Sequence, residues 1–156
     1  MTLQPHFHDN DNPLHLDSYA ADRPRRRTIL LVEDEPFVRE ATCGILRHAG
    51  FEVLPAADAQ EATNIFEARP SGIDLVMTDM VLPGATGQQL GQDLRMRSPA
   101  LVVLVTSGYG NLEFDTESPG SSTYFLAKPY SRKTLLEKID QILSAPQQAR
   151  PATQAG

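Results

Sequence analysis

Residues 28–37 read TILLVEDEPF, in which an apolar run passes directly into three acids. A short apolar run of this kind is typical of a strand that is buried on both faces. Pro36 follows the acids, and proline is favoured at the first position of a helix. The stretch therefore predicts a buried strand, an acidic loop of Glu33, Asp34 and Glu35, and the start of a helix.

Strand and helix patterns alternate along the rest of the chain. Further strands are predicted at residues 51–54, 73–79, 101–106 and 124–128. Apolar residues at helical spacing follow Pro36, Asp58 and Ser131 and also occur within residues 88–97. Three strands are apolar almost throughout, which is typical of a parallel sheet covered on both faces. We therefore expect the α/β class, with a doubly wound five-stranded parallel sheet.

Two segments depart from regular structure. Residues 108–122 contain a proline and three glycines and show little amphipathic spacing, so we expect a short or irregular fourth helix there. The sequence LPGATG (residues 82–87) predicts a turn, in which Gly84 and Gly87 supply the turn geometry.

The ends of the chain differ from its middle in composition. Residues 1–27 are polar and contain three prolines, which predicts a disordered N-terminal arm. Residues 28–144 form the predicted domain, and residues 145–156 form a predicted disordered tail. Because the chain ends soon after the last helix, we expect a stand-alone domain without an output domain of ordinary size.

The composition excludes several classes of function. The net charge of -6 argues against general affinity for nucleic acid. No apolar run approaches the roughly 20 residues of a membrane span, so no membrane association is expected. The single cysteine, Cys43, excludes a disulfide scaffold within the chain and suits a reducing compartment. A cytoplasmic protein is therefore predicted.

Polar side chains end four of the predicted strands. Glu33 and Asp34 follow the first strand, Asp79 ends the third, Thr106 the fourth and Lys128 the fifth. Ligands of such sheets bind outside the carboxyl ends of the strands. Three carboxylates gathered there repel one another unless a cation with a preference for oxygen ligands, such as Mg²⁺, lies between them. The sequence therefore predicts a magnesium site.

Lys128 and Thr106 make the predicted chemistry more specific. A lysine ammonium and a hydroxyl both bind phosphate oxygens, and with a metal they stabilise a phosphoryl group during transfer. Asp79 is then the nucleophile, and its product is an aspartyl phosphate.

At this point the sequence resembles a response-regulator receiver domain, the CheY-like fold of two-component signalling. The resemblance covers residues 28–144 and depends on ILLVEDE, DLVMTDMVLPGATG, VVLVTSGYG and YFLAKPY in that order. It implies Asp79 as the phosphoacceptor and Mg²⁺ ligands from Glu33, Asp34, Asp79 and the backbone carbonyl of Val81.

The resemblance also assigns residues to phosphoryl contact and to switching. It implies that Thr106 and Lys128 contact the phosphoryl group, and that Thr106 and Phe125 change position on phosphorylation. Tyr124 is expected on the opposite face of its strand from Phe125. A cis bond between Lys128 and Pro129 is implied as well.

The function implied is phosphoryl acceptance from the phosphohistidine of a sensor histidine kinase or histidine phosphotransfer protein. The output is then a change of protein partners, and the chain is not an enzyme in the sense of turnover. Its role as a signalling regulator, a phosphorelay intermediate or a phosphate sink stays open. Two rivals are a Mg²⁺-dependent phosphohydrolase with Asp79 as nucleophile and a receiver fold that binds partners without phosphorylation. The hydrolase is disfavoured by Val81, which stands where such enzymes place an acidic proton donor.

Overall fold

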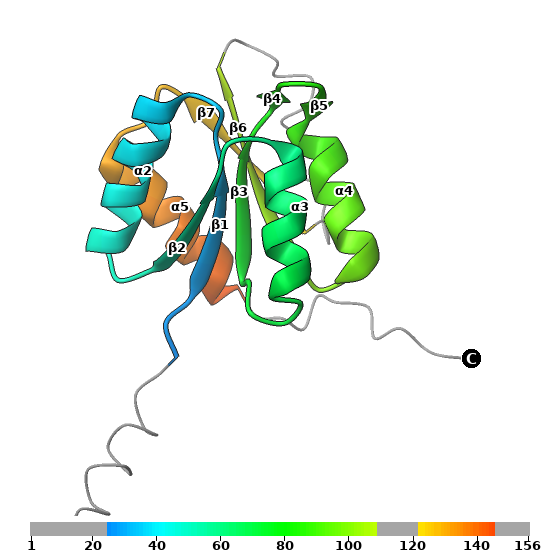
Figure 1. Ribbon diagram of the computed structural model, residues 1–156. Helices are drawn as coiled ribbons and strands as arrows, with labels where there is room; N and C mark the ends of the chain where they lie inside the picture. Colours follow the sequence, from blue (N-terminus) through cyan, green and yellow to red (C-terminus); the bar gives the residue numbers. More distant parts are fainter. Residues whose placement is uncertain (1–24, 109–121, 146–156) are drawn as a thin grey trace, which may run out of the picture.

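The computed structural model describes residues 25–108 and 122–145, and strands alternate with helices throughout this part (Figure 1). The elements in chain order are β1 (Thr28–Val32), α2 (Pro36–His48), β2 (Glu52–Ala56), α3 (Ala59–Ala68), β3 (Leu75–Asp79), β4 (Val81–Leu82), β5 (Ala85–Thr86), α4 (Gly87–Arg97), β6 (Val102–Gly108), β7 (Thr123–Lys128) and α5 (Arg132–Ser144). All five predicted strands are present, with ends shifted by one or two residues.

Five strands form one parallel sheet in the order β2-β1-β3-β6-β7, which confirms the predicted fold class. The strand order reverses direction after β2, so the chain builds the sheet outward from β1 on both sides. At the outer strand β2, Pro55 pairs with Leu31 of β1. The predicted turn at residues 82–87 is in fact a small antiparallel ribbon of β4 and β5 with Gly84 at its bend.

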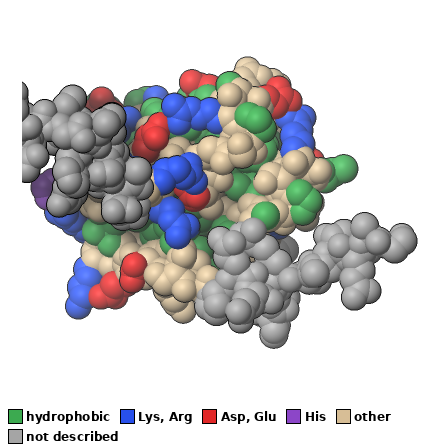
Figure 2. Space-filling model, turned by 90° about the horizontal axis from the view of Figure 1, so that it is seen from below, with side chains coloured by type: hydrophobic (Ala, Val, Ile, Leu, Met, Phe, Trp, Pro, Cys, Tyr) green, Lys and Arg blue, Asp and Glu red, His purple; other side chains and the backbone are tan. Residues whose placement is uncertain are grey.

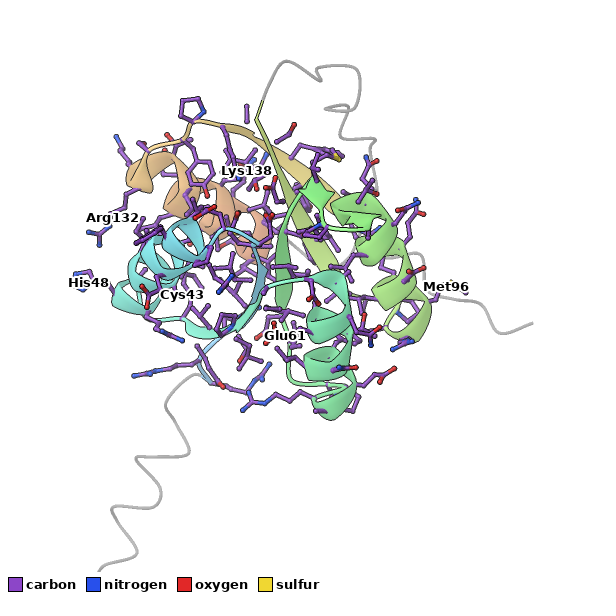
Figure 3. All side chains as sticks on the ribbon, turned by 45° about the horizontal axis from the view of Figure 1, so that its top comes forward. Cys43, His48, Glu61, Met96, Arg132 and Lys138 are labelled. Carbon is purple, nitrogen blue, oxygen red and sulfur yellow. The ribbon has the colours of Figure 1, made fainter. Side chains whose placement is uncertain are left out.

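Two apolar cores lie on the two faces of the sheet, as expected for a doubly wound fold. Helices α2 and α5 cover one face, and α3 and α4 cover the other (Figure 1). Alternate residues of β1 divide between the cores, since Leu30 and Val32 contact the α3 side and Ile29 and Leu31 the α2 side. Cys43 belongs to the α2 core, where its thiol is buried (Figure 3).

Three helices begin beside Pro36, Asp58 and Ser131, as the sequence predicted, and one further cap is present. Pro36 opens α2, and the side chains of Asp58 and Ser131 accept hydrogen bonds from the backbone at the starts of α3 and α5. The further cap is a reciprocal capping box at α4, where Thr86 and Gln89 each accept from the other's backbone N–H. This box fixes the first turn of α4 beside the end of β3.

Three predictions fall outside the described residues. These are the disorder of most of the N-terminal arm (1–24), the irregular fourth helix (109–121) and the disorder of the C-terminal tail (146–156). Of the predicted arm, residues 25–27 are described, and Arg25 donates a hydrogen bond of 2.9 Å to Asp74. The division of the chain at residues 27 and 144 stays a prediction.

Basic side chains gather at the end of the sheet where the strands begin. Viewed from that end, Figure 2 shows Lys and Arg side chains around the middle of the face. Arg25, Arg26 and Arg69 line a cavity of about 540 Å³ there. Two of these arginines form surface ion pairs, Arg69 with Glu52 at 2.6 Å and Arg25 with Asp74 at 2.9 Å. In the described ranges, no helix is both long enough and apolar enough to span a membrane.

Candidate phosphoryl-transfer site

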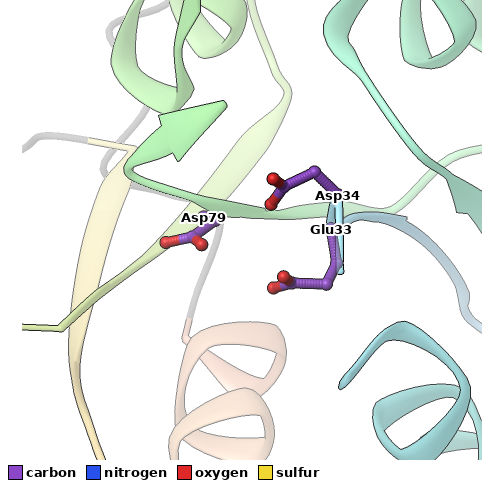
Figure 4. A group of neighbouring side chains, drawn as sticks. All are labelled: Glu33, Asp34 and Asp79. Carbon is purple, nitrogen blue, oxygen red and sulfur yellow. The ribbon is translucent and has the colours of Figure 1, made fainter. Parts of the chain in front are cut away.

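Three carboxylates meet at the end of the sheet where the strands finish. Glu33 and Asp34 follow β1, and Asp79 is the last residue of the neighbouring strand β3. One carboxylate oxygen from each lies within 4.8 Å of the other two (Figure 4). The topology therefore brings the three predicted acids together.

Lys128 lies between two of these acids. Its ammonium nitrogen is 3.4 Å from Glu33 Oε2 and 3.3 Å from Asp79 Oδ2. Burial disfavours the charged amine, but the charge of Asp79 and then of Glu33 outweigh this effect and raise the pKa of Lys128. The lysine at the end of β7 therefore stays cationic and holds two carboxylates that come from different strands.

Glu33 is the most deeply placed of the three acids, with only 8% of its side chain exposed. Its Oε1 accepts a hydrogen bond of 3.3 Å from the Glu35 backbone N–H. Burial nevertheless raises the pKa of Glu33, because the lost hydration outweighs the attraction of Lys128. The carboxylate is therefore held at this position by the fold and is not at its electrostatic optimum.

Thr106 stands beside Asp79 on the adjacent strand, since the two residues are paired in register between β3 and β6. Its hydroxyl is buried and donates to the Thr78 carbonyl oxygen at 3.4 Å, a long hydrogen bond. The Met80 N–H in turn donates to the Thr106 carbonyl at 2.8 Å. The structure thus places Thr106 next to Asp79, the predicted nucleophile. Its hydroxyl is hydrogen-bonded to the carbonyl of Thr78, the residue before Asp79.

The two aromatic residues of β7 lie on opposite faces of the sheet, as predicted. Phe125 is half-buried against the core of α3 and α4, and Tyr124 contacts the core of α2 and α5. The Tyr124 ring lies under the Lys138 ammonium, 5.7 Å from its centroid. The switch role of Phe125 stays a prediction.

The remaining predicted site residues lie close to Asp79 or Lys128. Val81 follows Asp79 by two positions in β4 and leaves 71% of its surface exposed. The metal-binding role of its carbonyl stays a prediction. The bond between Lys128 and Pro129 is cis, as the resemblance implied.

Gly87 has a different role from the one predicted. Gly84 has a φ of +73° and serves the turn, but Gly87 is the first residue of α4. A Cβ at Gly87 would lie 2.2 Å from the Asp79 carbonyl oxygen and 2.9 Å from Thr78 Cγ2. The Gly87 N–H also donates to the Met80 carbonyl at 2.8 Å. Gly87 therefore allows the α4 backbone to lie directly against the peptide group of Asp79.

Sequence reasoning missed two further contacts around the site. Arg39 of α2 donates a hydrogen bond of 2.8 Å to the Glu33 carbonyl. Tyr130, two residues after Lys128, hydrogen-bonds with Thr42 of α2, while burial raises the pKa of its phenol. The only signal in the sequence was position, since Arg39 lies in the first turns of the helix that follows the acids.

Sheet order, acids and lysine together are those of the CheY-like class of α/β domain. The chain belongs to the response regulator receiver domain family of two-component signalling, whose sequence profile matches residues 29–140. Among curated proteins, it is 34% identical to the sensor kinase CckA of Brucella abortus over 125 residues, 80% of this chain and 13% of the kinase. It is 32% identical to the sensory transduction protein RegX3 of Mycolicibacterium smegmatis, over 74% of this chain and 50% of that protein. The chain thus spans half or less of these relatives.

Solved structures give the same family. The receiver domain from the hybrid histidine kinase CckA is 36% identical, with a TM-score of 0.63 over 74% of this chain and 98% of that domain. A CheY-like receiver domain protein from Methanospirillum hungatei is 28% identical, with a TM-score of 0.70 over 81% of this chain and all of that one. The predicted membership of the receiver domain family is therefore confirmed.

Gly87→Ala tests the close approach of α4 to Asp79. The new methyl group requires the Asp79 peptide or the α4 terminus to move, so we expect a loss of about 2 kcal/mol in unfolding free energy. Gly44→Ala is the matched control: Gly44 lies exposed within α2, and its Cβ would meet nothing within 4 Å. The control is expected to gain about 1 kcal/mol from helix propensity. Urea unfolding of both variants decides, and equal effects would contradict the steric role.

The raised pKa of Glu33 predicts a definite pH dependence of stability. Folding raises this pKa above 4.5, so its stabilising contribution is complete below that pH and is lost as the pH rises through the folded value. In EDTA, the stability of the wild type relative to Glu33→Gln should therefore fall as the pH rises from 4.5 toward neutrality. Urea titrations across this range measure the difference.

Glu52 supplies a control of opposite sign. A hydrogen bond from Arg69 lowers the pKa of this exposed carboxyl below 4.5. The unfolding free energy of the wild type, measured relative to that of Glu52→Gln, should therefore decrease as the pH falls below 4.5. If the stability of the wild type relative to Glu33→Gln stays constant or increases as the pH rises, burial does not raise the pKa of Glu33.

Proposed function

We propose that Asp79 accepts a phosphoryl group from the phosphohistidine of a sensor histidine kinase or a histidine phosphotransfer protein, with Mg²⁺ as cofactor. The observation that supports this most is the position of Lys128, within 3.4 Å of both Glu33 and Asp79. A lysine held by the nucleophile itself also lies where the oxygens of an arriving phosphoryl group need a cation.

The proposed step transfers the phosphoryl group from an imidazole nitrogen to a carboxylate oxygen. An Asp79 carboxylate oxygen attacks phosphorus, the N–P bond of the phosphohistidine breaks, and its electron pair returns to the imidazole. The product is a mixed anhydride on Asp79. Lys128 moves its hydrogen bond from the carboxylate toward a phosphoryl oxygen, because the new oxygens carry the greater negative charge. The Thr106 hydroxyl, one strand away, is the proposed second donor to that group.

The donor set fits a hard divalent cation. Three carboxylate oxygens within 4.8 Å of one another match the oxygen ligands that Mg²⁺ takes, together with waters and phosphate oxygens. Glu33, Asp34 and Asp79 would hold the ion, with the Val81 carbonyl as a further ligand. When bound, Mg²⁺ neutralises the charge that builds up on the transferred phosphoryl oxygens.

The output proposed is a change in the proteins that bind the domain, and the domain itself is proposed not to turn over a substrate. We place this exchange in the cytoplasm, where the buried thiol of Cys43 stays reduced. That the receiver acts without an output domain stays a prediction, because the chain matches only part of its longer relatives. The roles of signalling regulator, phosphorelay intermediate and phosphate sink would all use the same site. We also propose that the domain has no nucleic acid partner.

The phosphohydrolase alternative needs a proton donor for the leaving group. The residue two positions after Asp79 is Val81, whose side chain carries no proton to transfer. Nothing in its position favours the hydrolase over the receiver.

Asp79→Asn tests the proposed phosphoacceptor. Incubated with Mg²⁺ and radiolabelled acetyl phosphate, the wild type should acquire a label that hydroxylamine removes, and Asp79→Asn should acquire none. Asp93→Asn, a change at an exposed aspartate on α4, is the matched control and should label like the wild type. EDTA should abolish labelling. Label on Asp79→Asn, or none on the wild type, would refute the assignment.

Exposed apolar side chains beside the acids suit a protein donor. Among the described residues, the large apolar side chains left exposed are Phe37, Val38, Val81 and Met96, and the first three lie within four positions of Asp34 or Asp79. Phe37, at the start of α2, is 81% exposed. Exposed aromatic residues are enriched where proteins dock, which supports a protein partner at this rim.

Phe37→Ala separates donor docking from chemistry. Loss of the ring should slow phosphotransfer about tenfold, as for an aromatic residue at an interface, when the donor is a histidine kinase that phosphorylates the wild type. Labelling by acetyl phosphate should not change, since this small donor needs no docking surface. Met96→Ala is the control, because Met96 is 84% exposed and lies in the last turn of α4, at the opposite end of this helix from Gly87 and Asp79 (Figure 3). Equal slowing with both donors would place Phe37 in the chemistry instead.

A further inference from the structure

Arg39 holds the peptide group that joins two of the three acids. Its guanidinium Nη1 donates to the Glu33 carbonyl oxygen at 2.8 Å, and that carbonyl belongs to the bond between Glu33 and Asp34. The Arg39 backbone N–H donates to the Glu35 carbonyl at 2.9 Å. One residue of α2 thus contacts the acidic loop through both its side chain and its backbone.

Within the loop itself, the Glu35 N–H donates a hydrogen bond to Glu33 Oε1 at 3.3 Å, but this bond does not reach the body of α2. The Glu33 N–H donates to the Ala56 carbonyl of β2 at 3.0 Å, which fixes where the loop begins. At its other end, Glu35 is the N-cap of α2 but makes no side-chain cap, and Pro36 has no N–H to donate. The hydrogen bond from Arg39 is therefore the contact that ties the middle of the loop to the helix.

The guanidinium is directed to this carbonyl and not to an acid. Among the described residues, Arg39 forms no ion pair with a carboxylate, although the loop carries three carboxylates and the neighbouring strand ends on a fourth, Asp79. Its contact with the acids therefore runs through the backbone. A fixed peptide group determines where the Glu33 and Asp34 side chains begin, and so how far apart their oxygens lie.

We propose that Arg39 is a positioning residue that sets the spacing of Glu33 and Asp34 for a divalent cation. The proposal rests on the metal site of the proposed function and adds a residue that does not touch the ion. Partners that orient metal ligands typically change metal affinity by 10–100-fold when they are removed. Arg39→Met keeps most of the side-chain volume but removes the donor.

Helix α2 supplies a matched control at its other end. Arg47 also donates from its guanidinium to a backbone carbonyl, that of Val53, at 3.3 Å. It lies in the last turn of α2, away from the acids. Arg39→Met and Arg47→Met therefore remove the same kind of bond from the same helix, and only one of the two bonds reaches the acidic loop.

The experiment is calorimetric titration of the full chain with MgCl₂, beside urea unfolding in EDTA. Arg39→Met should bind Mg²⁺ about tenfold more weakly than the wild type, and Arg47→Met should bind like the wild type. Both should lower the urea midpoint to a similar extent, because each loses one hydrogen bond. Arg39→Lys, which restores a donor, should recover part of the Mg²⁺ affinity.

The outcomes separate the inference from the proposed function. Wild-type affinity in Arg39→Met, or an equal loss in Arg47→Met, would overturn the role of Arg39 and leave the metal site intact. An Arg39→Lys variant no better than Arg39→Met would overturn its hydrogen-bond basis. A wild type that takes up no Mg²⁺ would instead contradict the metal role in the proposed function.

Discussion

Three carboxylates and one ammonium group share a single rim of the sheet, within a few ångströms of one another. Three negative charges less one positive charge leave two in excess, which is the charge of one divalent cation. The backbone positions of Glu33 and Asp79 are fixed relative to each other, because Asp79 ends β3, Glu33 follows β1 directly and the two strands are paired. The parallel sheet therefore imposes a repulsion that Lys128 relieves only in part.

The rest of the structure keeps that rim in place. The capping box of Thr86 and Gln89 fixes the start of α4, and Gly87 allows its backbone to lie against the Asp79 peptide. On the other side, the first turns of α2 hold the acidic loop. These contacts use backbone groups of the acids and of the segments beside them. The side-chain oxygens of Glu33 are held separately, Oε1 by the Glu35 N–H and Oε2 by Lys128, which also contacts one oxygen of Asp79.

The sequence predicted the structure correctly where the residue type at a position is compatible with only one structural role. Apolar runs predicted the strands, and polar residues at the strand ends then predicted the meeting of Asp79, Glu33 and Lys128, because parallel strands finish at one edge. The direction of the Thr106 hydroxyl was not readable, since a threonine offers its proton to whichever carbonyl lies nearest. Gly87 was predicted for the wrong reason, because a glycine in a turn and a glycine under a crossing backbone look the same in sequence. The box of Thr86 and Gln89 was readable as a Thr-x-x-Gln pattern before a helix.

The outer strand β2 has a property that concerns the molecule among its neighbours. Pro55 sits within this strand and has no N–H with which to bind another backbone. A strand from another molecule that paired with this edge of the sheet would lack a backbone N–H donor at Pro55. Self-association by continued sheet growth is therefore discouraged on that flank, and copies that meet there must recognise one another through side chains.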